Sequence, residues 1–386
     1  MGIEPARPKV GAYLHVPFCR RKCPYCDFAI TVSARPPLDA YHEALRREID
    51  DRANDGIGRQ LHSVYFGGGT PSLSSAEALV ETLRHVGGRF DGVPKEVTLE
   101  VNPEDGRALD YGALLRGGFT RLSFGAQSFD SEVLELLGRA HTAEQIRECV
   151  LDASNAGFEA LSIDLIHGVP GQSRLRLESD LSEIADLGQL DHVSIYELTV
   201  EPKTSFARRR ARGELRELTE DALADELELI TTSLNAAGFA RYEISSYAKP
   251  GAEAVHNAGY WDGTEYLGFG VGAHSFRLDG DRALRRVNGR STRRYLEDHS
   301  EESETVVLTR SEHLTERLLV GLRTTLGVDL AELRSWAGAE VQRLELLFDG
   351  WRTRGLVWLD GDHLRPTDAG LLVADALAAD VVDILL

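Results

Sequence analysis

Short apolar segments rich in β-branched residues alternate with longer segments of helical periodicity along the first 240 residues. The apolar segments predict strands over 12–17, 63–66, 96–101, 121–124, 161–165 and 192–198. Helices are predicted between them over 38–54, 75–86, 109–116, 142–156 and 174–187, and another follows the last strand over 220–237. This alternation is typical of α/β proteins with a parallel sheet of βαβ crossovers. Six such units are too few for a closed eight-unit barrel, so a partial, TIM-like (β/α)6 barrel is predicted.

After residue 300 the pattern changes. Helices are predicted over 309–324, 330–337 and 340–354, then a hairpin of strands 356–359 and 363–366, and a last helix from Asp368. Helices followed by a short β-wing indicate a winged-helix-like α+β domain. Such domains often bind DNA, but this segment has many acidic residues and no lysine. This composition favours a role in which the domain covers the open barrel or contacts a partner. We therefore expect a partial barrel over 1–238, a barrel-completing segment over 239–300 and a C-terminal domain over 301–386.

Composition narrows the class of protein. Among 386 residues, 42% are hydrophobic and 27% are charged, which is ordinary for a globular chain. No run approaches the roughly 18 apolar residues of a membrane span. With 43 basic and 62 acidic residues the net charge is −19, which opposes non-specific binding to nucleic acid. Four cysteines without a secretory signal argue against a disulfide scaffold and for a cytoplasmic protein.

The cysteines carry the most specific chemical signal. Cys19, Cys23 and Cys26 lie within eight residues, directly after the first predicted strand. A [4Fe–4S] cluster held by three thiolates keeps one iron without a protein ligand, where chemistry or ligand exchange takes place. The alternative is a structural zinc site with His15 as fourth ligand. Against zinc, Tyr13 and His15 fall on one face of the strand, which points His15 along the sheet.

Other unusual residues also follow the carboxyl ends of predicted strands. They are Gly67-Gly68-Gly69-Thr70-Pro71, Glu100 to Glu104, Gly125 and Gln127, Asp164 to Pro170, and Glu197 to Pro202. Function in (β/α) barrels collects at this rim, so one shared site is predicted. The glycines would allow close backbone approach and offer bare N–H and C=O groups to a ligand.

The ordered motifs HVPFCRRKCPYCDF, YFGGGTPS, LEVNPED, RLSFGAQSF, LLGRAHT, SIDLIHGVPGQ and HNAGYW span residues 11 to 275. With them the chain resembles the HemN/HemW branch of the radical S-adenosylmethionine (SAM) superfamily. The resemblance implies that the amino and carboxylate groups of SAM chelate the open iron. An electron from the cluster can then cleave the sulfonium to a 5′-deoxyadenosyl radical.

Position by position, the resemblance implies a set of SAM contacts. The corresponding residues are Tyr13, Gly68, Gly69, Thr70, Glu100, Gln127, Arg139 and Asp164. Glu100 and Asp164 can accept hydrogen bonds from the ammonium or the ribose hydroxyls, Gln127 can bond the ribose, and Arg139 can clamp a carboxylate. Taken singly, each residue type is also common as an ordinary hydrogen-bonded rim residue or surface charge.

One position divides the branch. Members that oxidatively decarboxylate coproporphyrinogen III have a further cysteine two residues after the third cluster ligand, and they have a longer amino-terminal extension. In this sequence Phe28 stands at that position, and about ten residues precede the first strand. The chain is therefore similar to the HemW group of heme chaperones. This resemblance implies that each monomer binds a cluster, SAM and one heme. It also implies that the heme is delivered to an unidentified acceptor protein, and that this includes transient contact with a membrane protein. The alternative is an oxygen-independent coproporphyrinogen III oxidase or another radical SAM enzyme.

The heme ligand is sought in His256-Asn257-Ala258-Gly259-Tyr260-Trp261, which matches the HNxxYW motif of that group. Neutral imidazole is a common axial ligand of heme iron, and the two aromatic residues could cover a macrocycle face. The alternative is a loop histidine bonded to backbone, with Tyr260 and Trp261 filling core. His274 is a second candidate ligand, and Cys149 is expected to be a small buried hydrophobic residue.

Overall fold

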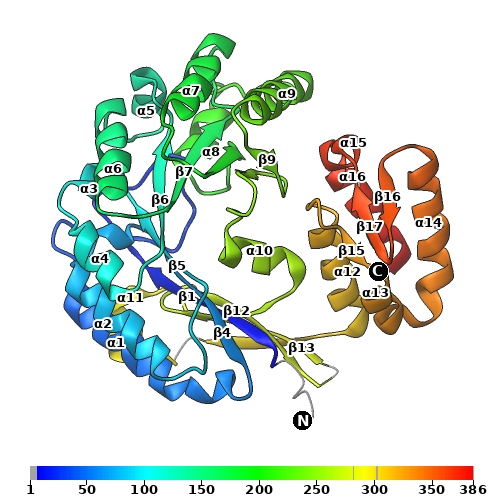
Figure 1. Cartoon of the computed structure of the whole chain (residues 1–386), viewed down its shortest axis with the longest axis horizontal. Coiled ribbons are helices and arrows are strands. Elements are labelled where there is room, and N and C mark those ends of the chain that lie inside the picture. The colour runs from blue at the N-terminus through cyan, green and yellow to red at the C-terminus, as the bar shows by residue number, and fades with distance from the viewer. Residues whose placement is uncertain (1–6, 281, 301–302, 386) are drawn as a thin grey trace.

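The computed structural model describes residues 7–280, 282–300 and 303–385. Its main feature is one strongly curved 12-stranded sheet with the order β14-β13-β12-β11-β1-β4-β5-β6-β7-β8-β10-β9 (Figure 1). Seven adjacent strands in the middle of this order run parallel. They are β11 (Glu265–Phe269), β1 (Lys9–Val16), β4 (Gln60–Gly68), β5 (Glu96–Val101), β6 (Arg121–Gln127), β7 (Ala160–His167) and β8 (His192–Glu197). The sheet is thus an incomplete barrel, as the strand count predicts.

Helices cover the convex face of the sheet (Figure 1). The six that follow the predicted pattern are α1 (Leu38–Asp51), α2 (Ala76–Gly87), α4 (Tyr111–Gly117), α6 (Ala143–Asn155), α7 (Arg174–Asp186) and α9 (Glu220–Ala236). Shorter helices are α3 (Pro103–Gly106), α5 (Ser131–Leu136), α8 (Ser205–Ala211), α10 (Val255–Asp262) and α11 (Thr292–Glu297), with 3-10 turns at Ala53–Gly56 and Pro71–Leu73. Most helices therefore lie outside the sheet, whereas α10 lies on its concave side (Figure 1).

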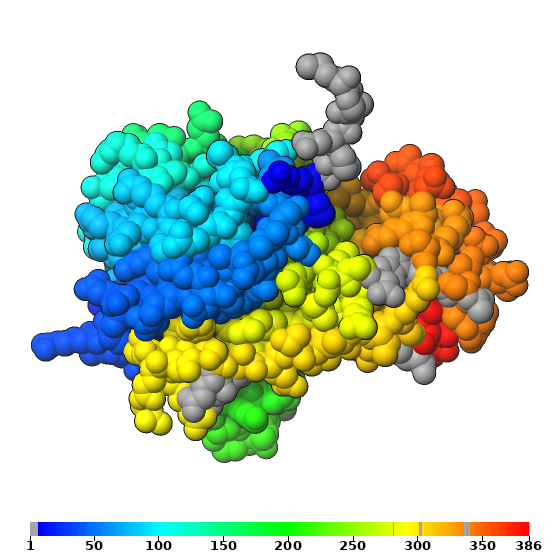
Figure 2. Space-filling model, turned by 90° about the horizontal axis from the view of Figure 1, so that it is seen from below, coloured from blue at the N-terminus to red at the C-terminus, as the bar shows by residue number. Residues whose placement is uncertain are grey.

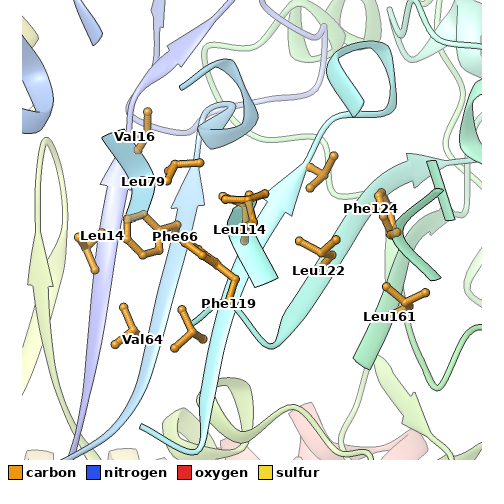
Figure 3. Packing of buried hydrophobic residues seen from close by; sticks show 14 of the residues in the cluster. Leu14, Val16, Val64, Phe66, Leu79, Leu114, Phe119, Leu122, Phe124 and Leu161 are labelled. Carbon is orange, nitrogen blue, oxygen red and sulfur yellow. The ribbon is translucent and has the colours of Figure 1, made fainter. Parts of the chain in front are cut away.

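The period-2 alternation of the strands explains where the core and the site lie. On β5, Val97 and Leu99 are buried in the main hydrophobic core, whereas Thr98 and Glu100 line the interior of the barrel. Figure 3 shows outward residues such as Phe66 of β4 packed among residues of α2 and α4. The interior of a closed (β/α)8 barrel is normally filled by branched apolar side chains. Here the interior is lined with polar groups, which leaves room for ligands.

The segment over 239–300 differs most from the predicted pattern. It supplies β11, whose parallel pairing with β1 makes a seventh parallel strand. Three antiparallel strands extend that edge, β12 (His274–Asp279), β13 (Arg282–Val287) and β14 (Glu304–Leu308), and β10 (Ser246–Ala248) with β9 (Ala240–Arg241) extends the other. The sequence of β13, RALRRV, has too few apolar residues to show a strand pattern. These strands form because the neighbouring edge offers free hydrogen-bonding groups.

A buried carboxylate fastens this added segment to the barrel. Glu48 of α1 is 0% exposed and accepts four hydrogen bonds. The donors are Arg52 Nη1 (2.8 Å), Gly270 N (2.8 Å), Asn288 Nδ2 (2.7 Å) and the Tyr295 hydroxyl (2.7 Å). Three of them belong to the segment over 265–297. A buried charge is tolerated only when it is paired and fully hydrogen-bonded, as it is here.

The C-terminal residues form a second lobe with its own core (Figure 2). Its elements are α12 (Arg310–Gly321), α13 (Leu330–Ala337), a 3-10 turn at Gly338–Glu340, α14 (Val341–Thr353), α15 (Asp368–Leu372), α16 (Ala374–Leu385), and a sheet of β15 (Val328–Asp329), β17 (His363–Pro366) and β16 (Val357–Asp360). The helices and the hairpin lie within a few residues of the predicted ranges. The domain boundaries remain a prediction, and β14 pairs with the large sheet although it lies beyond residue 301.

A polar seam joins the two lobes. Arg317 of α12 donates to the backbone carbonyls of Trp261 and Asp262 at the end of α10. Glu316, beside it, forms an ion pair with Arg285 of β13. No side chain belongs to both hydrophobic cores in the described part of the chain. The lobes are thus held together by hydrogen bonds, a charge pair and the stacking of Phe276 on His313 of α12, rather than by a shared apolar core.

Candidate functional site

The cysteine loop follows β1 and returns on itself. Its two short strands, β2 (Phe18–Cys19) and β3 (Thr31–Val32), pair with each other, and Ser33 N donates to the Cys19 carbonyl at 3.1 Å. All three cysteines are free and partly exposed. They line one side of a cavity of about 400 Å³ at the carboxyl end of the parallel strands, which we call the mouth pocket. The predicted thiolate triad therefore opens into one shared space.

Both ends of this loop are fastened to the barrel. Arg20 bonds Asp105 at 2.8 Å and Arg21 bonds Glu104 at 3.2 Å, which ties the loop to the end of β5. On the returning side, His15 Nε2 lies 2.9 Å from the carbonyl of Ala29. Because a carbonyl can only accept, His15 carries its proton on Nε2, and Nδ1 accepts from the Tyr13 hydroxyl at 3.1 Å.

The position of His15 corrects one sequence-based expectation and weakens the zinc alternative. His15 does contact the cysteine loop, but through a carbonyl and with both nitrogens used. Burial lowers its pKa to about 4, so the imidazole is neutral. Among the described residues, no three His, Cys, Asp or Glu side chains surround one point as ligands of a single metal ion. A cubane places each thiolate on a different iron and does not need that arrangement.

The glycine turn after β4 packs directly against the cysteine loop. A Cβ on Gly69 would lie 2.8 Å from the backbone of Pro17, and one on Gly68, at φ +113°, would lie 2.5 Å from the ring of His15. The expectation of bare N–H groups is wrong for these two residues. Gly68 N donates to Glu100 at 3.0 Å and Gly69 N donates to the Val16 carbonyl at 2.8 Å. The glycines are needed chiefly for close packing of two loops.

Two partly buried carboxyl groups, those of Glu100 and Asp164, form the inner wall of the mouth pocket. Glu100 accepts from the Tyr65 hydroxyl at 2.8 Å, and Asp164 accepts from Ser123 at 3.0 Å. Burial raises the pKa of Glu100 to about 7 and that of Asp164 to about 6. A cationic ligand entering the pocket would favour the charged form of both groups. The wall is therefore suited to an ammonium group.

Two more predicted residues complete the mouth pocket. Gln127 follows an irregularity in β6 and has φ 68°, a conformation that non-glycine residues rarely adopt and that turns the chain into the rim. Arg139 donates to the Gly125 carbonyl at 2.9 Å and to Asn102. Arg139 also approaches Cys23, with 3.8 Å between Nη1 and Sγ. The pocket thus gathers the three cysteines and seven of the nine residues predicted to bind cofactors: Gly68, Gly69, Thr70, Glu100, Gln127, Arg139 and Asp164.

Tyr13 and His256 are the two that lie elsewhere. They line a second cavity of about 200 Å³ deeper in the barrel, which we call the inner chamber. Tyr65, Glu100, Asp164 and Tyr196 border both cavities. Sequence reasoning missed Tyr65 and Tyr196, although period-2 alternation from Gly67 and Ser194 would have placed both on the inner face. In this structure Tyr13 does not reach the mouth pocket.

His256 lies on helix α10, not in a loop, at the amino end of the strands. Its Nδ1 is 2.8 Å from Ser63 Oγ and its Nε2 is 2.9 Å from the Tyr260 hydroxyl. The side chain is 4% exposed, and burial lowers its pKa to about 3. Tyr260 is 36% exposed and also lines the inner chamber. His274, the second candidate, is exposed at the start of β12. Cys149 is buried, as expected, and contacts the Pro103 carbonyl.

Comparison with known proteins places this geometry in a family. The radical SAM superfamily matches residues 13–184, and the HemN C-terminal domain matches residues 308–373. The chain is 37% identical to the heme chaperone HemW of Mycobacterium tuberculosis (strain CDC 1551 / Oshkosh), over 97% of this chain and 94% of that protein. It is also 37% identical to the heme chaperone HemW of Lactococcus lactis, over 93% of each chain.

Among solved structures, coproporphyrinogen III oxidase (HemN) from Escherichia coli, a radical SAM enzyme, superposes with a TM-score of 0.79. That match covers 97% of this chain and 90% of the other at 24% identity, and it shows a shared fold. In the described part of the chain, no helix is long and apolar enough to cross a membrane.

Proposed function

Because the chain belongs to the HemW family of radical SAM proteins, we propose that it is a heme chaperone that binds heme and a SAM-liganded [4Fe–4S] cluster and passes the heme to an acceptor protein. One observation supports this proposal most. Three free thiols open into a pocket whose inner wall carries the carboxyl groups of Glu100 and Asp164, and among the described residues no fourth thiol lines it. We further propose that the protein works in the cytoplasm and that its acceptor is another protein, not a nucleic acid.

The donor set fits the implied cofactors. Cys19, Cys23 and Cys26 would hold the cluster, which supplies one-electron chemistry when bound. Glu100 would accept a hydrogen bond from the amino group of SAM, because its carboxylate lies at the inner wall of the pocket. Asp164 and Gln127 would accept or donate hydrogen bonds to the ribose.

The second candidate function is oxygen-independent oxidation of coproporphyrinogen III, and the shared fold with that enzyme is its support. Phe28 speaks against it. This residue lines the mouth pocket with its side chain 62% exposed, at the position where the oxidases have a further cysteine. An apolar ring there cannot supply the thiol.

A pair of measurements separates the two functions. Anaerobically reconstituted protein is expected to contain about four iron and four sulfide per chain. With coproporphyrinogen III, SAM and a reductant, we expect no protoporphyrinogen, whereas titration with heme should saturate at one per chain. Formation of protoporphyrinogen would establish the oxidase, and failure to take up heme would refute the chaperone.

SAM affinity is expected to depend on pH through Glu100. Its pKa of about 7 means that the group is mostly neutral at pH 6 and mostly a carboxylate at pH 8. Since the N–H groups of the iron-bound amino group donate to the carboxylate more strongly than to the neutral acid, affinity should rise about tenfold from pH 6 to pH 8. Isothermal titration of the reconstituted protein measures this rise. The Glu100→Gln variant should bind SAM weakly and with little pH dependence; an equally steep rise in the variant would contradict the role of Glu100.

Heme uptake is expected to weaken in the His256→Ala variant. Heme cannot enter the inner chamber, whose volume of about 200 Å³ is below the roughly 300–1,000 Å³ of pockets for larger ligands. It would approach past the exposed side of Tyr260, and Nε2 would bind the iron once the Tyr260 hydroxyl had moved away. Titration followed by the Soret band measures the effect. If His274→Ala weakens uptake and His256→Ala does not, the ligand is His274.

A further inference from the structure

Each cysteine of the loop has its own hydrogen-bond donor. The Thr70 hydroxyl donates to Cys19, with 3.5 Å between Oγ1 and Sγ. Arg139 Nη1 donates to Cys23 Sγ at 3.8 Å, and the Tyr25 hydroxyl also contacts this sulfur. The backbone N–H of Phe28 lies close to Cys26. The three sulfurs therefore differ in their surroundings: one faces a hydroxyl, one a cation and a phenol, and one an amide.

Arg139 is the charged member of this set, and its guanidinium is held in place. Nη2 donates to the Gly125 carbonyl at 2.9 Å and to the Asn102 side chain, which leaves Nη1 directed at Cys23. The side chain is only partly exposed, so its charge is screened less than that of a surface arginine. These contacts exist without SAM, whose carboxylate the family resemblance assigns to Arg139.

We propose that these donors, Arg139 above all, set the reduction potential of the cluster by hydrogen bonding to the sulfurs that bind iron. One-electron reduction adds one negative charge to the cluster. A cation and N–H or O–H donors at the sulfurs stabilise that charge more in the reduced state than in the oxidised state. Removing them lowers the potential. This inference rests on the proposed function, because it requires the cluster.

The test is a potentiometric titration of the full reconstituted chain without SAM. Dithionite supplies the electron, and electron paramagnetic resonance measures the reduced cluster. At the wild-type midpoint, Arg139→Gln should lower the reduced-to-oxidised ratio about tenfold, which equals about 59 mV for a one-electron couple. Arg139→Lys keeps the charge and should restore most of the ratio.

Thr70 gives an independent measurement with a conservative pair. Thr70→Val removes the hydroxyl at nearly constant volume and should lower the ratio about threefold, as expected for one hydrogen bond. Thr70→Ser keeps the donor and should match the wild type. Arg147→Gln is the matched charge control. Arg147 is 39% exposed, pairs with Glu183 on the outer helices and should leave the potential unchanged.

The outcomes separate the two hypotheses. If the wild type takes up no iron, the proposed function fails. If Arg139→Gln and Thr70→Val load iron and keep the wild-type potential, the inference fails, and weaker SAM binding in Arg139→Gln would then assign Arg139 to SAM alone. If Arg139→Gln does not load iron, the comparison of Thr70→Val with Thr70→Ser decides.

Discussion

The Cys23→Ser variant is expected to be purified without its cluster. A serine hydroxyl remains protonated near neutral pH and binds iron poorly, so two thiolates would remain where three are needed. Iron and sulfide should fall from about four per chain to near zero, and the absorbance of the cluster around 400 nm should disappear. The same loss is expected for Cys19→Ser and Cys26→Ser.

Cys149→Ser is the matched control. Cys149 is buried on α6 and its Sγ lies 3.5 Å from the Pro103 carbonyl, an acceptor that a serine hydroxyl can also reach. Its iron content should equal that of the wild type. Full iron content in Cys23→Ser would contradict the assignment of the thiolate triad. Heme uptake should survive in Cys23→Ser, because α10 lies at the opposite end of the strands.

Glu48→Ala is expected to cause the largest loss of stability. The substitution leaves Arg52 as a buried, unpaired charge and removes the acceptor of Gly270, Asn288 and Tyr295. Breaking a buried ion pair by removing one partner typically costs about 3–5 kcal/mol. Urea unfolding followed by circular dichroism measures the change in the free energy of unfolding.

Glu43→Ala on the same helix is the control for Glu48→Ala. Glu43 pairs with Arg47 on the surface, where the side chains are 66% and 49% exposed. Exposed pairs of this kind contribute about 0.3–0.5 kcal/mol. A loss in Glu48→Ala no larger than that in Glu43→Ala would show that the buried carboxylate is not needed to join α1 to the added strands.

The strands and helices of the barrel could be predicted because their apolar residues alternate regularly. β5 begins and ends at the predicted residues, Glu96 and Val101. The same holds for α13 of the C-terminal lobe, over Leu330–Ala337. The added strands could not be predicted in this way. β13 has three arginines in six residues, and it forms a strand only because it pairs with the edge of the barrel sheet. Helix α10 was missed for a similar reason. It contains Asn, Gly and two aromatic residues, and it is held by Glu96 and Ser63 rather than by its own propensity.

The part of the site that could be predicted is the part formed by residues directly after the parallel strands, because the carboxyl ends of these strands meet at one rim. Each of the strand-end segments in the motif pattern contributes residues to the mouth pocket. Tyr13 was assigned to this pocket by resemblance, but its hydroxyl turns to His15 and its ring lies 6.4 Å from that of His256. The two cavities lie at different depths along the strands. Sequence periodicity predicts which face of the sheet a side chain lies on, but it does not predict which of the two cavities that side chain lines. The donors to Cys19 and Cys23 come from loops distant in sequence, which no local pattern reveals.

The polar seam between the lobes has a consequence for how the molecule responds to its surroundings. Each lobe has a complete apolar core, so each can melt as a separate cooperative unit. Arg317 and the Arg285–Glu316 pair join them through electrostatic contacts, which dissolved ions attenuate while leaving apolar packing intact. Raising the ionic strength should therefore weaken the contacts across the polar seam while both lobes stay folded. Calorimetry should then resolve two heat-absorption peaks in place of one broad transition.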